Sequence, residues 1–227
     1  MTAKVVPTSL LVPYAMLAMS IAHAEAPMNV DDAGTLNKGG MKVEGVWHKD
    51  ENVTGGALLF GFSPIETLEL EIGALHDNNV TDSPNATMRG GGLGAKWVPI
   101  QNETGWSLGA RFDYGHTRVE GKVEHEYALT GLASYRFDNH QVLHLNAGAV
   151  HVEASEGREN LHTWGIGYDF PLREGLQLTA EIFGEAESGP DKALGLRYEI
   201  FDGFKVSASV GYGNDRGFGQ AGFAWEF

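Results

Sequence analysis

The 227-residue chain contains no cysteine, and it carries only 16 Lys and Arg against 30 Asp and Glu, a net charge of -14. Without cysteine the chain forms no disulfide framework, iron–sulfur cluster or thiolate zinc site. The acidic balance argues against a nucleic-acid binder, because phosphate neutralisation requires clustered Lys and Arg. Proline is also rare, at 8 residues.

Long apolar runs are absent too. After the first two dozen residues, no segment reaches the ~18 apolar residues that a membrane-spanning helix requires. This excludes a helical membrane protein. It does not exclude a strand-built one, because barrel strands give weak hydropathy signals.

Glycine, in contrast, is abundant, with 31 residues, about twice the usual share of ~7%. The chain is 42% hydrophobic, which argues against disorder. Its length suits one domain.

The N-terminus has the pattern of a secretory signal. Lys4 precedes an apolar stretch from Leu10 to Ala22, and small residues flank His23 at Ala22 and Ala24. A charged segment, a short apolar segment and an A-x-A-like site are typical of a cleaved signal peptide. We therefore expect a signal peptide at residues 1–24 and export through the inner membrane. Residues 25–39 lack alternation and are predicted to be a periplasmic lead-in, with a lumen plug as the alternative. The domain is predicted over residues 40–227.

The remaining chain alternates apolar and polar residues with period two, which is typical of half-exposed strands. Between Leu176 and Ile182 the even positions are apolar and most odd positions are polar. The final run, from Gln220 to Phe227, alternates in the same way, with its apolar residues at the odd positions. Twelve such stretches are recognisable, with ten as the next choice. Several exceed the ~10 residues that a tilted barrel strand needs to cross a bilayer. The pattern predicts an all-β fold, a transmembrane antiparallel up-and-down barrel.

Connections between these stretches fall into two sets. One set is short, as at Asp138-Asn139 and Asp202-Gly203; the other is longer and polar, as at His76 to Ala86, Ala154 to Asn160 and Glu185 to Lys192. Short periplasmic turns opposite longer external loops are typical of outer-membrane barrels. At Asp202-Gly203 we expect Ile200 to oppose Phe204, with Gly203 closing a three-residue loop.

Aromatic residues gather at strand ends, where the rings of a barrel meet lipid headgroups. We expect one girdle on the turn side and one toward the loops. The turn-side group contains Trp47, Phe62, Trp97, Trp106, Phe137, Phe170, Phe204 and Trp225, and the loop-side group contains Tyr114, Tyr127, Trp164 and Tyr212.

The last five residues, Phe223-Ala224-Trp225-Glu226-Phe227, resemble the C-terminal signature of Gram-negative outer-membrane barrels. The resemblance implies that Phe223, Trp225 and Phe227 form an assembly signal read by the barrel-assembly machinery. The segment from Leu194 to Phe227 also resembles the end of the MetA-pathway-of-phenol-degradation barrels, a group regarded as outer-membrane channels. Neither resemblance implies an active-site residue. Outer-membrane lipids and lipopolysaccharide are the expected surroundings, in the cell outer membrane.

If the large apolar side chains face lipid, the charged residues of the strands face the lumen. This set holds ten acids and six bases: Lys42, Glu44, Glu69, Glu71, Lys96, Arg111, Asp113, Glu126, Arg136, Asp169, Glu181, Glu185, Arg197, Glu199, Lys205 and Glu226. We expect Glu199 to face Lys205 and Glu181 to lie near Arg197. One interpretation is a ladder of ion pairs that stiffens the wall. The other is a narrow path that selects solutes by charge.

The predicted function is a narrow passive channel for small solutes, with a preference for cations. Barrels of 8 strands are filled by side chains and porins of 16 to 18 hold water, so twelve strands are intermediate. A structural or adhesin-like role through external loops is the alternative.

A lipid hydrolase is the second alternative, because His151, Glu153, Ser155 and His162 supply a base, an acid and a hydroxyl near one rim. The set is short and does not match known lipase-barrel motifs, so no catalytic residue is assigned and the chain is not predicted to be an enzyme. His116, His125, His144 and His151 lack the spacing of a metal site, and no metal or cofactor is predicted.

Overall fold

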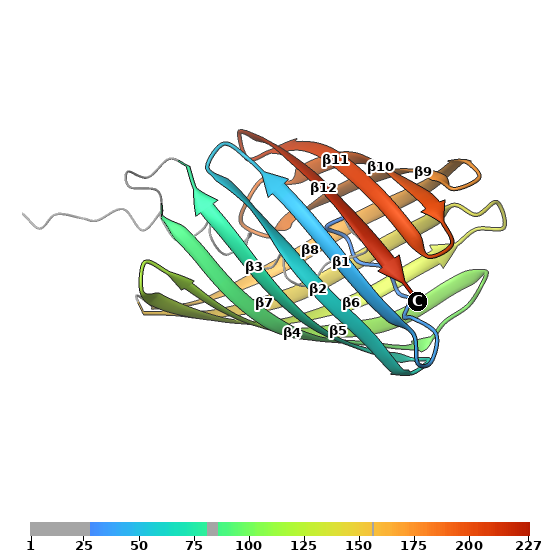
Figure 1. Cartoon of the computed structure of the whole chain (residues 1–227), viewed down its shortest axis with the longest axis horizontal. Helices are drawn as coiled ribbons and strands as arrows, with labels where there is room; N and C mark the ends of the chain where they lie inside the picture. The colour runs from blue at the N-terminus through green and yellow to red at the C-terminus, as the bar shows by residue number, and fades with distance from the viewer. Residues whose placement is uncertain (1–27, 81–85, 156) are drawn as a thin grey trace, which may run out of the picture.

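The computed structural model describes residues 28–80, 86–155 and 157–227. These residues form twelve β-strands (Figure 1). The strands are β1 Met41–Lys49, β2 Val53–Ile65, β3 Leu68–Asn79, β4 Thr87–Ile100, β5 Gly105–Val119, β6 Lys122–Arg136, β7 Val142–Ala154, β8 Gly157–Arg173, β9 Leu176–Glu185, β10 Asp191–Phe201, β11 Phe204–Gly213 and β12 Arg216–Glu226. No helix in the described part of the chain is long and apolar enough to span a membrane.

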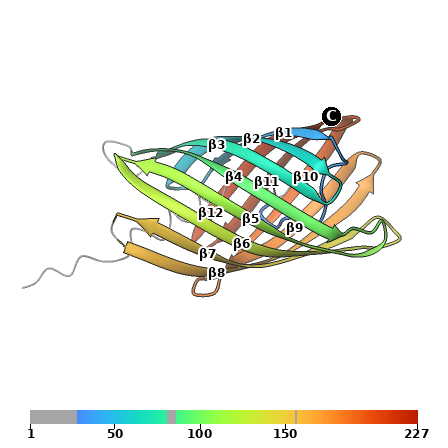
Figure 2. The same cartoon turned by 90° about the horizontal axis from the view of Figure 1, so that it is seen from below.

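Each strand pairs antiparallel with its sequence neighbours, and β1 pairs with β12 to close the barrel. The seam is continued by the last residue, since the backbone groups of Met41 and Phe227 exchange hydrogen bonds of 2.8 and 2.9 Å. Phe223 lies opposite Gly45, where a Cβ atom would come within 2.4 Å of its ring. The predicted twelve-stranded antiparallel barrel is therefore confirmed, and Figures 1 and 2 show its strongly tilted strands.

Burial in this barrel is inverted relative to a soluble protein. Outward-facing Leu58 and Val210 are 62% and 70% exposed, whereas inward-facing Arg111 is 2% exposed. Because the two faces of a strand alternate, one sequence pattern builds an apolar outer surface and a charged lumen. Such a surface requires lipid around it.

The loops at this end of the barrel are shorter than the sequence suggested, because the strands extend further. Ala154 to Asn160 was expected to be a loop, but β7 extends to Ala154 and β8 begins at Gly157. Likewise β5 and β6 meet at Glu120 and Gly121, whose φ angles of 50° and 84° fit a tight hairpin turn. Strands of up to 17 residues exceed the ~9–11 needed to cross a bilayer, so the hairpins continue beyond it.

The Asp202-Gly203 turn departs from its predicted register. Glu199 does oppose Lys205, but Phe201, not Ile200, opposes Phe204, and the register shifts between Glu199 and Phe201. A bulge accommodates the extra residue. Gly203 is left-handed, with φ of 75°, as predicted for the closing residue.

The aromatic residues selected from the sequence lie on the outer surface. Their exposed fractions range from 36% to 62% across Trp47, Trp97, Trp106, Trp164, Tyr212 and Trp225. Trp47 was placed on the turn side, but it lies two residues from the loop end of β1. The error arose because β1 is only 9 residues long, so a position near its end in sequence was assigned to the wrong girdle.

The segment before β1 does not remain outside the barrel. Residues 28–36 lie within the lumen (Figure 1), Asn37 and Lys38 are exposed at its mouth, and Gly39 and Gly40 then turn the chain into β1 at the short-turn end. The buried residues Val30 and Ala33 are 1% and 0% exposed. The predicted periplasmic lead-in is thus wrong for these residues, and the alternative, a segment inside the lumen, describes them. The predicted signal peptide lies outside the described residues.

Candidate functional site

The lumen segment, residues 28–36, separates two cavities of the barrel interior. A cavity of about 180 Å³ lies toward the loops and is lined by Asn29 and Asp31 of the segment. A cavity of about 510 Å³ lies toward the turns and is lined by Met28, Val30 and Asp32. Successive side chains of residues 28–32 line opposite cavities, so the segment forms a partition across the lumen.

Polar wall residues hold the backbone of the lumen segment. Glu181 on β9 accepts hydrogen bonds from the backbone N–H groups of Asn29 and Val30, at 2.6 and 2.7 Å. Asn146 on β7 bonds the N–H and the C=O of Asp31, at 2.6 and 2.8 Å. Each of these wall groups satisfies backbone that would otherwise be buried without partners.

A third wall strand, β6, also binds the backbone of the lumen segment. Ser134 on β6 accepts from the N–H of Ala33 at 2.7 Å and also bonds the ring of His144 at 2.9 Å. Ala33 itself packs with the inward-facing Val98 and Leu132. Three wall strands therefore fix the segment in one position across the lumen.

Charge pairs fix the side chains of the same segment. Lys96 lies 2.8 Å from an Asp31 oxygen and 3.1 Å from an Asp32 oxygen. Arg111 reaches the other Asp31 oxygen at 3.2 Å, and Arg136 lies 3.6 Å from Asp32. Burial alone would raise the pKa of Asp32, but the neighbouring side chains of Lys96, His144 and Arg136 outweigh burial and lower that pKa to about 2.

The wall beside Asp31 is a dense ion-pair network. Lys42 on β1 lies within 3.3 Å of Glu44, 2.6 Å of Glu69 and 2.7 Å of Glu71. Arg111 also bonds Glu71, and its Nε lies 2.9 Å from Asp113. All these side chains are buried or nearly so, and most carboxylates contact a base. This region matches the prediction of an ion-pair ladder.

Across the lumen, the pairing differs from the prediction. Arg197 lies 3.4 Å from Asp169 and opposes Gln177 on β9, while Glu181 opposes Ala193. Glu181 therefore lies two inward-facing positions along β9 from Gln177, the residue that opposes Arg197. The predicted Glu181–Arg197 pair is wrong because Glu181 is engaged by the lumen segment instead.

Residues nearest the turns form looser contacts. Lys205 lies 3.4 Å from Glu226 on the neighbouring strand. Glu199 accepts a hydrogen bond from the Gly203 N–H at 3.1 Å, which ties the side chain to the β10–β11 turn. The turn-side cavity as a whole is lined by four acids and four bases: Asp32, Asp169, Glu174, Glu199, Arg136, Arg173, Arg197 and Lys205.

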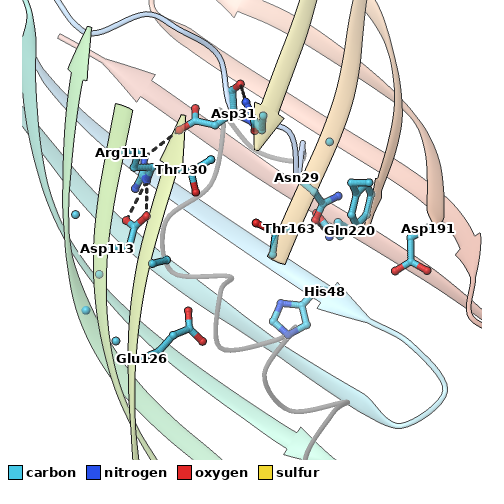
Figure 3. Close-up of a pocket in the computed structure, with 18 of the residues that line it drawn as sticks. Asn29, Asp31, His48, Arg111, Asp113, Glu126, Thr130, Thr163, Asp191 and Gln220 are labelled. Carbon is cyan, nitrogen blue, oxygen red and sulfur yellow. Dashed lines mark hydrogen bonds and ion pairs between the residues drawn. The ribbon is translucent and has the colours of Figure 1, made fainter. Parts of the chain in front are cut away.

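The loop-side cavity has a different charge balance, with seven acids against three bases. They are Asp31, Asp50, Glu71, Asp113, Glu126, Glu185, Asp191, Lys49, Arg111 and Arg216. Arg216 lies within 3.4 Å of Asp191 and 2.5 Å of Asp50. Figure 3 shows Glu126, His48 and Asp191 around this space.

Two carboxylates of the loop-side cavity are buried without a base. Glu126 and Glu185 are each 6% exposed, and each has an oxygen with no hydrogen-bond partner in the described part of the chain. Glu126 lies close enough to Asp113 and Glu185 for their charges to repel. A buried carboxylate without a base is costly to keep charged.

Sequence alternation selected many inward-facing charges of the strands, but it missed Asp77, Asp191 and Arg216 near the strand ends, and Asp31 and Asp32. The basic partners of Asp31 and Asp32 lie 64 to 104 residues away in the chain. Local alternation carries no information about contacts at such separations, and the segment is too short for a period to be recognised.

The residues considered for hydrolysis do not form a relay. His151 and Glu153 face outward, 3.5 Å apart, and His151 also contacts Asn160 at 2.7 Å. In the described part of the chain, no hydrogen bond joins Ser155 to either histidine. Nor does any group of three or more His, Asp or Glu among residues 28–80, 86–155 and 157–227 have the arrangement of a metal site.

Comparisons with known proteins agree with the architecture. The family model described as "Uncharacterised conserved protein UCP029691" matches residues 13–220. No curated protein matches the chain significantly. Among solved structures, an outer membrane channel (COG4313) from Pseudomonas putida F1 is similar, with a TM-score of 0.66 and 9% identity over 86% of this chain and 98% of that one.

Two further structures share the fold. The KdgM porin in complex with disordered oligogalacturonate has a TM-score of 0.62 and 13% identity, covering 82% of this chain and 99% of that one. The outer membrane phospholipase A of Escherichia coli has a TM-score of 0.51 and 10% identity, covering 92% and 95%. At such low identity these likenesses establish the fold of outer-membrane barrels and no shared activity.

Proposed function

The chain belongs to the family described as Uncharacterised conserved protein UCP029691, whose description names no activity, and we propose that it is an outer-membrane barrel that passes small solutes passively, with a preference for cations. The observation that carries the proposal is the pair of cavities within one closed barrel, one toward the loops and one toward the turns, on either side of the lumen segment.

The wall chemistry supports passive passage. Glycine faces the loop-side cavity at Gly73, Gly92, Gly94 and Gly115, which leaves space where larger side chains would fill a barrel of this size. The structural similarity to porins and channels, and the resemblance of the last third of the chain to MetA-pathway barrels, favour the same role.

The charge of the lumen supports the cation preference. Seven acids against three bases line the loop-side cavity, so a cation gains and an anion loses Coulomb energy on entering from that side. Glu126 and Glu185 face this cavity, each with an oxygen that has no hydrogen-bond partner within the described residues.

The alternatives have less support in the structure. An adhesin-like role requires external loops, but β5–β6 and β11–β12 are joined by two-residue turns. A hydrolase requires a nucleophile beside its base, and Ser155 makes no such contact in the described part of the chain.

Planar-bilayer recordings test the proposal. In a tenfold KCl gradient, the mature barrel should conduct with a reversal potential displaced toward that of K⁺. The double variant Glu126→Gln/Glu185→Gln should conduct with a reversal potential closer to zero. A matched control, Glu153→Gln, removes an outward-facing carboxylate and should leave the reversal potential unchanged. Absence of conductance, or a displacement toward Cl⁻, would contradict the proposal.

A further inference from the structure

The outer surface of β3 to β8 carries a basic patch at the loop end. The patch consists of His76, Arg89, His116, Arg118, His125, His151 and Arg158, which all occupy outward-facing strand positions. Arg89 and Arg118 are exposed, and the Arg158 side chain is 74% exposed. Their position on the lipid-facing side separates them from the lumen charges.

Strand register brings the patch residues side by side. His76 opposes Arg89 across β3 and β4, and Arg89 opposes Arg118 across β4 and β5. Two residues nearer the membrane, His116 opposes His125, with ring centroids 4.9 Å apart. Three adjacent strands therefore present a row of basic side chains to the outside.

Two directly opposed arginines repel each other, and like charges in this position destabilise a sheet. Glu153 neutralises Arg158, since its carboxylate lies 3.0 Å from the Arg158 Nε. Arg89 and Arg118, in contrast, have no acidic partner among the described residues. An anion that bridged both side chains would relieve the repulsion between them.

The position of the patch along the strands indicates which part of the membrane it faces. Tyr114 opposes Tyr127, with rings 5.3 Å apart, and these tyrosines belong to the loop-side girdle at the headgroup boundary. His116 and Arg118 follow Tyr114 by two and four residues, about 7 and 13 Å along the strand. The patch is thus at headgroup level, on the leaflet that the loops face.

We propose that Arg89 and Arg118, supported by His76, His116 and His125, bind the phosphate groups of an outer-leaflet glycolipid, the lipid A part of lipopolysaccharide. Guanidinium groups bind phosphate oxygens in bidentate geometry, and they remain charged at every physiological pH. The apolar surface directly below the patch accommodates the acyl chains of the same lipid. This site lies on the outer face and does not depend on the proposed channel.

Native mass spectrometry of the mature barrel in detergent tests this inference. The probes are bisphosphorylated lipid A and the same lipid after removal of both phosphates. The wild type should retain the bisphosphorylated form in strong preference. Each of Arg89→Gln and Arg118→Gln should weaken that retention by about tenfold or more.

Lys192→Gln provides the matched control, because Lys192 is an exposed base on β10, on another part of the rim beside Tyr212. This variant should bind lipid A as the wild type does. Equal retention by the arginine variants, or equal retention of the lipid without phosphates, would overturn the inference. Conductance of the arginine variants in phospholipid bilayers should be unchanged, so a failure here is distinct from a failure of the channel proposal.

Discussion

The two halves of the lumen share a wall and differ in how their charges are used. Around the lumen segment, Lys96, Arg111 and Arg136 lie within 3.6 Å of Asp31 or Asp32. On the loop side, seven acids face three bases, and Glu126 and Glu185 keep oxygens without partners. The first region holds the lumen segment in place, whereas the second is the region in which we propose that cations are favoured.

If the lumen segment is a partition, a reagent added on one side should reach the two cavities at different rates. Because the described chain has no cysteine, single introduced cysteines can report this. Thr130→Cys lines the loop-side cavity and Gln177→Cys the turn-side cavity. In proteoliposomes of known orientation, a bulky charged thiol reagent added at the loop side should modify the first cysteine faster than the second by orders of magnitude. Equal rates would show that the segment forms no partition.

Removing one base from the paired region should reduce stability strongly. Arg111→Met leaves Glu71, Asp31 and Asp113 without a shared counter-charge, at a cost of about 3–5 kcal/mol in the free energy of unfolding. Urea unfolding in lipid vesicles, followed by tryptophan fluorescence, measures this. Lys192→Gln, which removes an exposed base on the outer face, is the control and should be close to neutral. A loss below 1 kcal/mol for Arg111→Met would contradict a structural role for the network.

Removing a charged group from the loop-side cavity should not lower the free energy of unfolding. Glu126→Gln removes a buried carboxyl group that contacts no base among the described residues, so the free energy of unfolding should stay the same or rise, while the cation preference falls. Glu69→Gln is the comparison. The Glu69 carboxylate lies 2.6 Å from Lys42, so its removal should lower the free energy of unfolding. If both variants destabilise equally, the two halves do not differ in the way described.

Sequence reasoning reached the strands, their number and their inward charges because a single local rule, alternation with period two, determines all of them. It placed Glu69 and Arg111 correctly on the inner face. It missed the lumen position of Asp31, the bulge at Ile200 and the partner of Glu181, since each depends on contacts between distant segments. Long-range pairing, not strand propensity, decides these features.

The smallest expected effect is a pH dependence of the lumen segment. The pKa of Asp32 is lowered from 3.8 to about 2, so its stabilising contribution is complete above about pH 4 and is lost as the pH falls toward 2. Because the Asp32 side chain is 39% exposed, solvent screening reduces the effect. Unfolding of Asp32→Asn should depend less on pH between about 4 and 2 than unfolding of the wild type. Identical pH dependence would show that Asp32 contributes nothing to the hold on the segment.

The conductance of the mature barrel, compared with that of a variant lacking residues 28–38, tests the central claim most directly. If the lumen segment is the constriction of a passive pore, the mature barrel should show small conductance steps and the deletion variant should show steps several times larger. Equal steps would contradict the constriction, and the absence of steps in both folded proteins would contradict the pore.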